Sequence, residues 1–188
     1  GVTFTSLKIG TIFAGLLTLP YIYLLGKELA GRWVGLTAFF LAGIAYWPNV
    51  ISRIGLRFPF YALFAAPTIY YLILGLRYGK RNYFILSGLA LGLGLHGYSP
   101  FRIVPLVVLI GFGMAFFANH SKKYKQTIFW YFCLLAFTAL IIFLPLLRYA
   151  IENPVMFGIR AFSRLTPIEK PLAKPAFEIF IENLWNAL

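Results

Sequence analysis

Residues 49–60 read NVISRIGLRFPF and place two arginines, Arg53 and Arg57, between two segments that are apolar enough to cross a bilayer. Residues four apart lie on one face of a helix, so we expect the two guanidinium groups to lie together if this stretch is helical. A guanidinium stays charged at every physiological pH and favours anionic partners beside a membrane. The fold therefore depends on the spans that flank this stretch and on the side of the membrane that it faces.

The composition is that of an integral membrane protein. Of the 188 residues, 61% are hydrophobic and 12% are charged, whereas soluble domains average about 45–50% apolar and about 25% charged residues. The net charge of +12 comes from small groups of cations between apolar runs, a distribution that excludes a nucleic-acid-binding face. The lone Cys133 excludes an internal disulfide. Because the chain begins with Gly1 and no signal peptide opens it, we expect an internal piece of a longer protein.

Six apolar runs predict an all-α, polytopic transmembrane helix bundle of about six spans within residues 1–150. Gly88, Gly92 and Gly94 have spacings that allow another helix to approach closely. Residues 151–188 are predicted to form an extracytoplasmic tail, and residues 175–188 have the apolar stripe expected of an interfacial amphipathic helix. The predicted spans are residues 9–25, 33–51, 61–76, 83–95, 101–118 and 127–147.

Alternate connectors differ in charge, and this difference predicts the orientation. Eight cations lie in one set of connectors, whereas the other set carries only Arg53, Arg57 and Arg102. Positive residues favour the cytoplasmic side, so the arginine stretch and the connector of residues 96–102 should both face outward. The eight cytoplasmic cations are Lys27, Arg32, Arg77, Lys80, Arg81, Lys122, Lys123 and Lys125.

The outward connectors hold the candidate site. Arg53 and Arg57 either extend toward lipid headgroups or bind a phosphate or diphosphate on a lipid or sugar, with the Ser52 hydroxyl as a further donor. The second connector, HGYSPFR, offers His96, Tyr98 and Arg102 within seven residues, although a histidine at the end of a span is often only interfacial. We expect both connectors to line one outward cavity.

The sequence shows no general base and no metal site. It contains no aspartate, Glu28 is predicted to be cytoplasmic, and the other four glutamates lie in or beside the tail. The two histidines, His96 and His120, are predicted to lie on opposite sides, and no phosphate-binding loop of the GxxxxGK type exists. We therefore predict no cofactor and leave the catalytic residue unassigned.

The order of SRIGLR, an apolar span, a basic turn, SGLALGLGLHGYSPFR and a further span resembles GT-C glycosyltransferases of the protein O-mannosyltransferase type, including bacterial relatives that modify lipopolysaccharide. The opening residues GVTFTSLKIGTIFAGLLTLPYIYLLGKELAGR also resemble the second membrane segment of those enzymes. The likeness covers about residues 1–150 and rests on hydropathy order and short basic and aromatic signatures.

The resemblance implies a multi-pass protein of the cell membrane, in bacteria the inner membrane, that moves a sugar from a polyprenyl-phosphate donor to an unknown acceptor on the outer side. It further implies that Arg53, Arg57 and Arg102 contact the lipid phosphate or the sugar, and that His96 and Tyr98 shape the sugar end. The family's base is usually an aspartate in the first outer loop. This chain has none, so we expect that loop to precede Gly1 and the fragment alone to be inactive.

Three other classes remain open. A transporter or flippase for an anionic lipid or solute would use the same arginines, but it should carry polar groups near the bilayer midplane, and the predicted spans have almost no ionisable residues there. A polymerase or ligase of surface polysaccharide is a transferase of different architecture. A structural scaffold would leave the arginines without a required partner.

Overall fold

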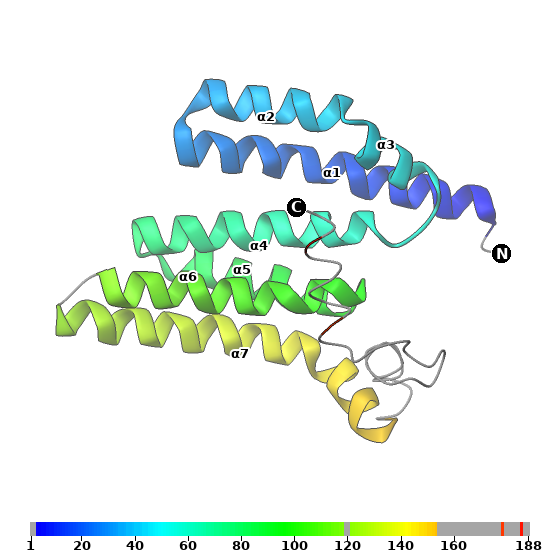
Figure 1. Ribbon diagram of the computed structural model, residues 1–188. Coiled ribbons are helices and arrows are strands. Elements are labelled where there is room, and N and C mark those ends of the chain that lie inside the picture. Colours follow the sequence, from blue (N-terminus) through cyan, green and yellow to red (C-terminus); the bar gives the residue numbers. More distant parts are fainter. Residues whose placement is uncertain (1–2, 119–120, 154–177, 179–184, 186–188) are drawn as a thin grey trace. The chain divides into compact units, whose positions relative to one another are not determined.

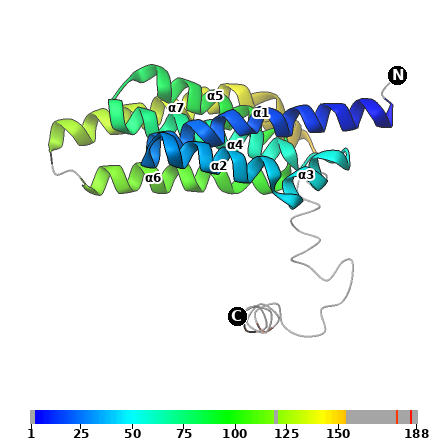
Figure 2. The same cartoon turned by 90° about the horizontal axis from the view of Figure 1, so that it is seen from above.

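The computed structural model in Figure 1 describes residues 3–118, 121–153, 178 and 185, and these residues form helices and connectors without any strand. The chain divides into two compact units, Gly1–Leu144 and Pro145–Leu188. Within the first unit, the longer helices run in alternating directions along a common axis (Figure 2). The helices are α1 Phe4–Ala30, α2 Arg32–Ile44, α3 Tyr46–Arg53, α4 Pro59–Tyr78, α5 Arg81–Leu95, the 3₁₀ helix η1 Ser99–Ile103, α6 Val104–Ala118 and α7 Lys122–Glu152.

The first two helices form a tightly packed hairpin. Gly31 makes the turn with a φ of 96°, a backbone conformation that favours glycine. Gly26 and Gly35 then bring the backbones into contact, since a Cβ on Gly35 would lie 2.6 Å from the carbonyl oxygen of Tyr23. Thr3 begins α1 with a capping box, in which Thr3 and Ser6 satisfy each other's backbone amides.

The predicted span at residues 33–51 is broken into two helices. The helix α2 ends at Ile44, Ala45 is extended with a ψ of 129°, and α3 begins at Tyr46. Pro48 explains the break, because it cannot donate to the Ile44 carbonyl and is tolerated only in the first turn of a new helix. The Asn49 side chain donates to the carbonyls of Gly43 and Ala45 at 2.8 and 2.9 Å, which satisfies carbonyl groups at the broken end.

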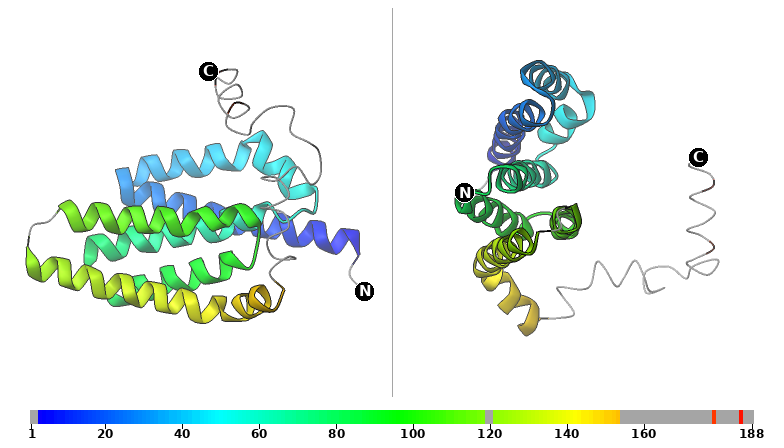
Figure 3. Two further views of the ribbon diagram at one scale, coloured as in Figure 1. Left: turned by 60° about the horizontal axis from the view of Figure 1, so that its bottom comes forward. Right: turned by 90° about the vertical axis from the view of Figure 1, so that its left-hand side faces the viewer.

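The helix α4 lies between the α1–α2 hairpin and α5, as the end-on view in Figure 3 shows. It ends at Gly79, whose φ is 65° and whose amide donates to the Gly75 carbonyl at 2.8 Å. The fully buried Phe84 ring packs against Gly75, where a Cβ would lie 2.9 Å from the ring. The buried Ser87 hydroxyl donates to the Thr68 carbonyl at 2.8 Å and joins α5 to α4 within the apolar layer.

Small residues of α5 allow the close approach that the sequence predicted. A Cβ on Gly88 would lie 2.6 Å from the Leu135 carbonyl oxygen, and one on Gly92 would lie 2.8 Å from the Ile142 Cβ. The GxxxG spacing therefore places α5 directly against the backbone of α7. The core around this contact comes from α4 to α7, with Leu72, Leu91, Val108, Phe112, Ile128, Leu135 and Ala139 among its buried members.

The outer surfaces of the helices are apolar, as a lipid-facing surface requires. Phe13, Leu109 and Phe137 are 61%, 55% and 62% exposed in three different helices. In the described part of the chain, four helical segments are long and apolar enough to cross a membrane, namely Phe4–Ala30, Pro59–Tyr78, Pro100–Ala118 and Lys122–Glu152. The chain is thus a multi-pass membrane protein.

The predicted count of six spans is not confirmed. The helices α2 and α5 have 13 and 15 residues, which correspond to about 20–23 Å at 1.5 Å per residue, and a bilayer core is about 30 Å thick. The break at Ala45 shortens α2, and the turn at Gly79 together with His96 bounds α5. The predicted amphipathic helix at residues 175–188 lies outside the described residues, apart from Glu178 and Trp185.

Candidate functional site

The two connectors that were predicted to face outward, residues 49–60 and 96–102, meet at one end of the first unit. The Phe58 and Tyr98 rings contact each other edge to face, with 4.8 Å between their centroids. Behind them, Tyr61 contacts Phe101 with 5.9 Å between the ring centroids. Because Arg57 directly precedes Phe58 and η1 directly follows Tyr98, this contact places the segments that carry Arg57 and Arg102 side by side.

The arginine stretch does not continue as one helix. The helix α3 ends at Arg53, and Gly55 turns the chain with a φ of 79°. The condition for a shared helical face of Arg53 and Arg57 is therefore not met, because the left-handed Gly55 between them interrupts the helical register. Both side chains are exposed at the ends of the turn.

Ser52 has a structural position and faces the first helix. It is buried, and its hydroxyl donates to the Asn49 carbonyl at 2.9 Å. The Ser52 carbonyl accepts from the Thr11 hydroxyl at 2.7 Å, and the Ser52 Cβ lies against Gly15 of α1. Ser52 thus holds α3 on α1. It lies next to the turn at Gly55 between Arg53 and Arg57, which is called the arginine turn below.

His96 faces the last helix of the unit. Its Nε2 lies 2.8 Å from the Ile142 carbonyl oxygen, and its ring centroid lies 6.3 Å from that of Phe143. A carbonyl oxygen can only accept, so Nε2 is the donor of this hydrogen bond. His96 therefore joins the end of α5 to α7.

The connector after His96 is fixed by a ring buried against a glycine. Phe101 is completely buried, and a Cβ on Gly94 would overlap the Phe101 ring at 2.1 Å. This contact anchors η1 on the end of α5. Arg102, the next residue, is exposed in η1, and the half-buried Tyr98 immediately precedes η1.

Lys8 is a further cation at this end that was not predicted from the sequence. A Cβ on Gly55 would lie 3.5 Å from the Lys8 Cγ, so the arginine turn packs on the Lys8 side chain. The Lys8 Nζ lies 4.5 Å from the centroid of the Phe4 ring. The sequence signal that could have identified Lys8 is its position just before the first apolar run. The helix α1 has 27 residues and is about 40 Å long, so it is longer than the bilayer core.

The opposite end of the unit carries the basic connectors and Glu28, whose carboxylate accepts hydrogen bonds from two side chains. Arg77 donates to the carboxylate of Glu28 at 2.9 Å and to its backbone carbonyl at 2.8 Å, and the Tyr78 hydroxyl donates to the same carboxylate at 3.0 Å. The Glu28 carboxylate thus joins the ends of α1 and α4. In residues 3–118 and 121–153 no three His, Cys, Asp or Glu side chains gather as metal ligands.

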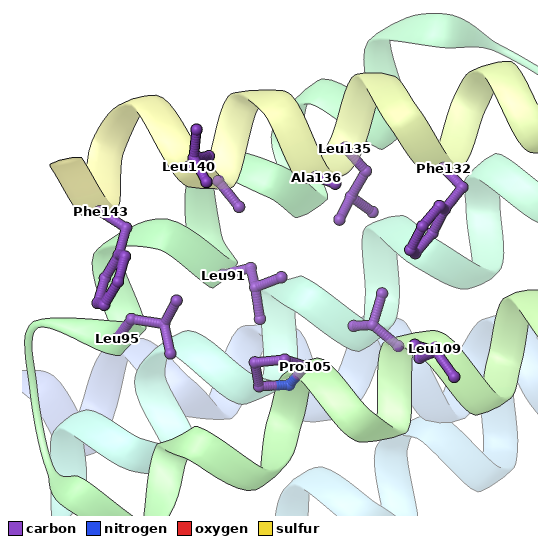
Figure 4. Close-up of a pocket in the computed structure, with 11 residues that line it drawn as sticks. Leu91, Leu95, Pro105, Leu109, Phe132, Leu135, Ala136, Leu140 and Phe143 are labelled. Atoms are coloured by element: carbon purple, nitrogen blue, oxygen red, sulfur yellow. The ribbon is translucent and has the colours of Figure 1, made fainter. Parts of the chain in front are cut away.

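An apolar groove of about 250 Å³ lies between α5, α6 and α7 (Figure 4). Its lining includes Leu91, Leu95, Pro105, Leu135 and Phe143. Leu95 and Phe143 bring the groove next to His96, since Leu95 precedes His96 and the Phe143 ring contacts it. The groove therefore extends from the connector end of the site into the apolar layer.

The fold and these connectors define a multi-pass helical membrane protein whose cationic connectors meet at one end. Residues 1–149 match the family model described as dolichyl-phosphate-mannose-protein mannosyltransferase. This match covers most of the chain, so the chain belongs to that family and is a membrane glycosyltransferase of the GT-C type. No curated protein and no solved structure matches the chain significantly.

Proposed function

We propose that this glycosyltransferase takes its sugar from a polyprenyl-phosphate donor on the extracytoplasmic side and transfers it to an acceptor there. The contact between Phe58 and Tyr98 is the observation that supports this most directly, because it places two cationic connectors together. Arg53, Arg57 and Arg102 then meet the phosphate of the donor, and Lys8 adds a fourth charge.

The chemistry of the transfer gives these cations a role. When the acceptor hydroxyl attacks the sugar, the lipid phosphate leaves with increasing negative charge. Cations fixed where that charge develops stabilise the transition state more than the ground state. His96 and Tyr98 border the sugar end in this proposal.

The apolar groove supports a lipid-linked donor over a soluble nucleotide sugar. A polyprenyl tail needs apolar surface within the bilayer, and the groove between α5, α6 and α7 begins at the connector that carries His96. The described spans offer no observation that favours a transporter or flippase. The proposal therefore places the phosphate at the connectors and the first isoprenoid units along Leu95 and Phe143.

The proposal is tested in membranes that contain the full-length protein. Radiolabelled polyprenyl-phosphate mannose serves as the first probe, and loss of label from the lipid extract measures transfer without knowledge of the acceptor. We expect Arg53→Ala and Arg57→Ala each to lower the rate at least tenfold, because removal of one charge-stabilising donor costs about 10²–10³ in well-studied enzymes.

Arg32→Ala is the matched control, since it removes a guanidinium from the opposite end of the unit. It should leave the rate within about twofold of the wild type. Unchanged transfer in both connector variants, at equal protein levels, would remove the support for a phosphate site at these arginines. If no polyprenyl-phosphate sugar is consumed while a nucleotide sugar is, the donor class in the proposal is wrong.

A further inference from the structure

A second cavity lies at the end of the unit opposite to the candidate site, between the end of α4 and the start of α7. Its volume is about 380 Å³. Leu76 and Ile128 form an apolar floor, and Tyr124 and Tyr131 belong to its walls. A cavity with an apolar floor and phenol groups suits a molecule that is itself part apolar and part polar.

The wall of this cavity is well fixed. The Tyr131 hydroxyl donates to the Gly79 carbonyl at 2.9 Å, and the Tyr131 ring stacks on the buried Phe84 ring with 4.6 Å between centroids. Gly79 also lines the cavity and is held in the left-handed conformation that ends α4. These contacts keep the α4 and α7 sides of the cavity in place without a ligand.

The polar rim of the cavity is cationic. Lys123 and Thr127 line it, and Lys80 directly follows the lining residue Gly79. Among the residues that the structure describes, no carboxylate lies within ion-pair distance of Lys123, and the acid predicted for this end, Glu28, is already paired with Arg77. The charge of Lys123 is therefore available to an anion.

We propose that this cavity binds an anionic phospholipid of the cytoplasmic leaflet, with its phosphate at Lys123 and its glycerol and upper acyl chains on Leu76 and Ile128. Basic pockets between spans on the cytoplasmic side suit such headgroups. The apolar floor favours a lipid over a free anion. Phe129 and Trp130 next to the cavity are 56% and 64% exposed on a membrane-spanning helix, as expected at the lipid interface.

The test measures lipid that stays bound to the purified protein. The complete protein is placed in nanodiscs of equal parts phosphatidylglycerol and phosphatidylcholine, released into detergent and analysed by native mass spectrometry. We expect the wild type to retain phosphatidylglycerol about three- to fivefold over phosphatidylcholine. Lys123→Gln should lower retained phosphatidylglycerol by a similar factor, because one cation near a phosphate contributes that much.

Two further variants separate the cavity from general surface charge. Lys122→Gln removes the same charge from the neighbouring residue, which does not line the cavity, and should lower retention clearly less than Lys123→Gln does, because its ammonium group is not placed in the cavity to contact the phosphate. Thr127→Phe fills the cavity without a change in charge and should lower retention as much as Lys123→Gln does.

Equal losses in Lys122→Gln and Lys123→Gln, or full retention in Thr127→Phe, would overturn the proposal. Displacement of the lipid by millimolar inorganic phosphate would also overturn it, because the cavity would then bind the phosphate group alone. The measurement does not involve sugar transfer, so a failure of the proposed donor chemistry would leave it unaffected.

Discussion

At the scale of single residues, the contact between Gly94 and Phe101 determines where the second connector lies. Gly94→Ala would place a methyl group within the space of the fully buried Phe101 ring. Overpacking of this kind costs about 1–3 kcal/mol. We expect a lower midpoint of thermal unfolding in detergent and, because η1 carries Arg102, a lower transfer rate.

The matched control for that substitution is Gly113→Ala in α6, where a Cβ would have no neighbour within 4 Å. It should keep or slightly raise the unfolding midpoint, because alanine is the better helix former. A second test combines Gly94→Ala with Phe101→Leu, which removes the opposing ring and should restore part of the loss. Equal midpoints for Gly94→Ala and Gly113→Ala would contradict the packing argument.

The same scale shows what the sequence could not reveal about the candidate site. The residue types in the two connectors and their common side followed from charge and from the order of the apolar runs. The partners of His96 and Ser52 did not, because Ile142 and Thr11 lie 46 and 41 residues away along the chain. Lys8 was missed for the same reason, since only the turn at Gly55 brings it to the arginines.

At the scale of elements, the α1–α2 hairpin depends on small residues at its contact. Gly35→Ala would bring a methyl group to 2.6 Å from the Tyr23 carbonyl and 2.9 Å from the Lys27 amide nitrogen. Since these are backbone atoms, they cannot move independently of α1. We expect a loss of about 1–3 kcal/mol in stability, measured as a lower denaturation midpoint in detergent.

Gly43 lies in the same helix, and a Cβ added to it would have no neighbour within 4 Å. Gly43→Ala should therefore stabilise the protein by up to about 1 kcal/mol through helix propensity alone. The two alanine variants thus have opposite expected signs within one helix. Loss of stability in both variants would show that the effect of Gly35→Ala does not come from the close contact with α1.

The elements also show why boundaries were harder to predict than the helices themselves. The apolar runs identified the positions of the main helices, and the GxxxG spacing of Gly88 and Gly92 identified a close helix contact. The extended Ala45 was not predicted, because hydropathy is continuous across it and only Pro48 and Asn49 specify the break. A hydropathy pattern does not detect this break, because a proline and local hydrogen bonds define it and the residues around it remain apolar.

At the scale of the whole molecule, the alternating directions of the longer helices predict which connectors lie on the same side of the membrane. With Cys133 replaced by serine, Leu56→Cys adds a single thiol in the arginine turn, and Lys80→Cys adds one in the α4–α5 turn. Both residues are exposed, so a membrane-impermeant maleimide can reach them from their own side. The charge bias of the connectors places the arginine turn outside and the α4–α5 turn inside.

We therefore expect Leu56→Cys in the complete protein to be labelled in intact cells, and Lys80→Cys to be labelled only after the membrane is opened. The wild-type Cys133, which lies within the span Lys122–Glu152, should resist labelling in both conditions. Labelling of both introduced cysteines from one side would mean that α4, at 20 residues, does not cross the bilayer. The reversed pattern would place Arg53 and Arg57 in the cytoplasm, where an extracytoplasmic donor phosphate could not reach them.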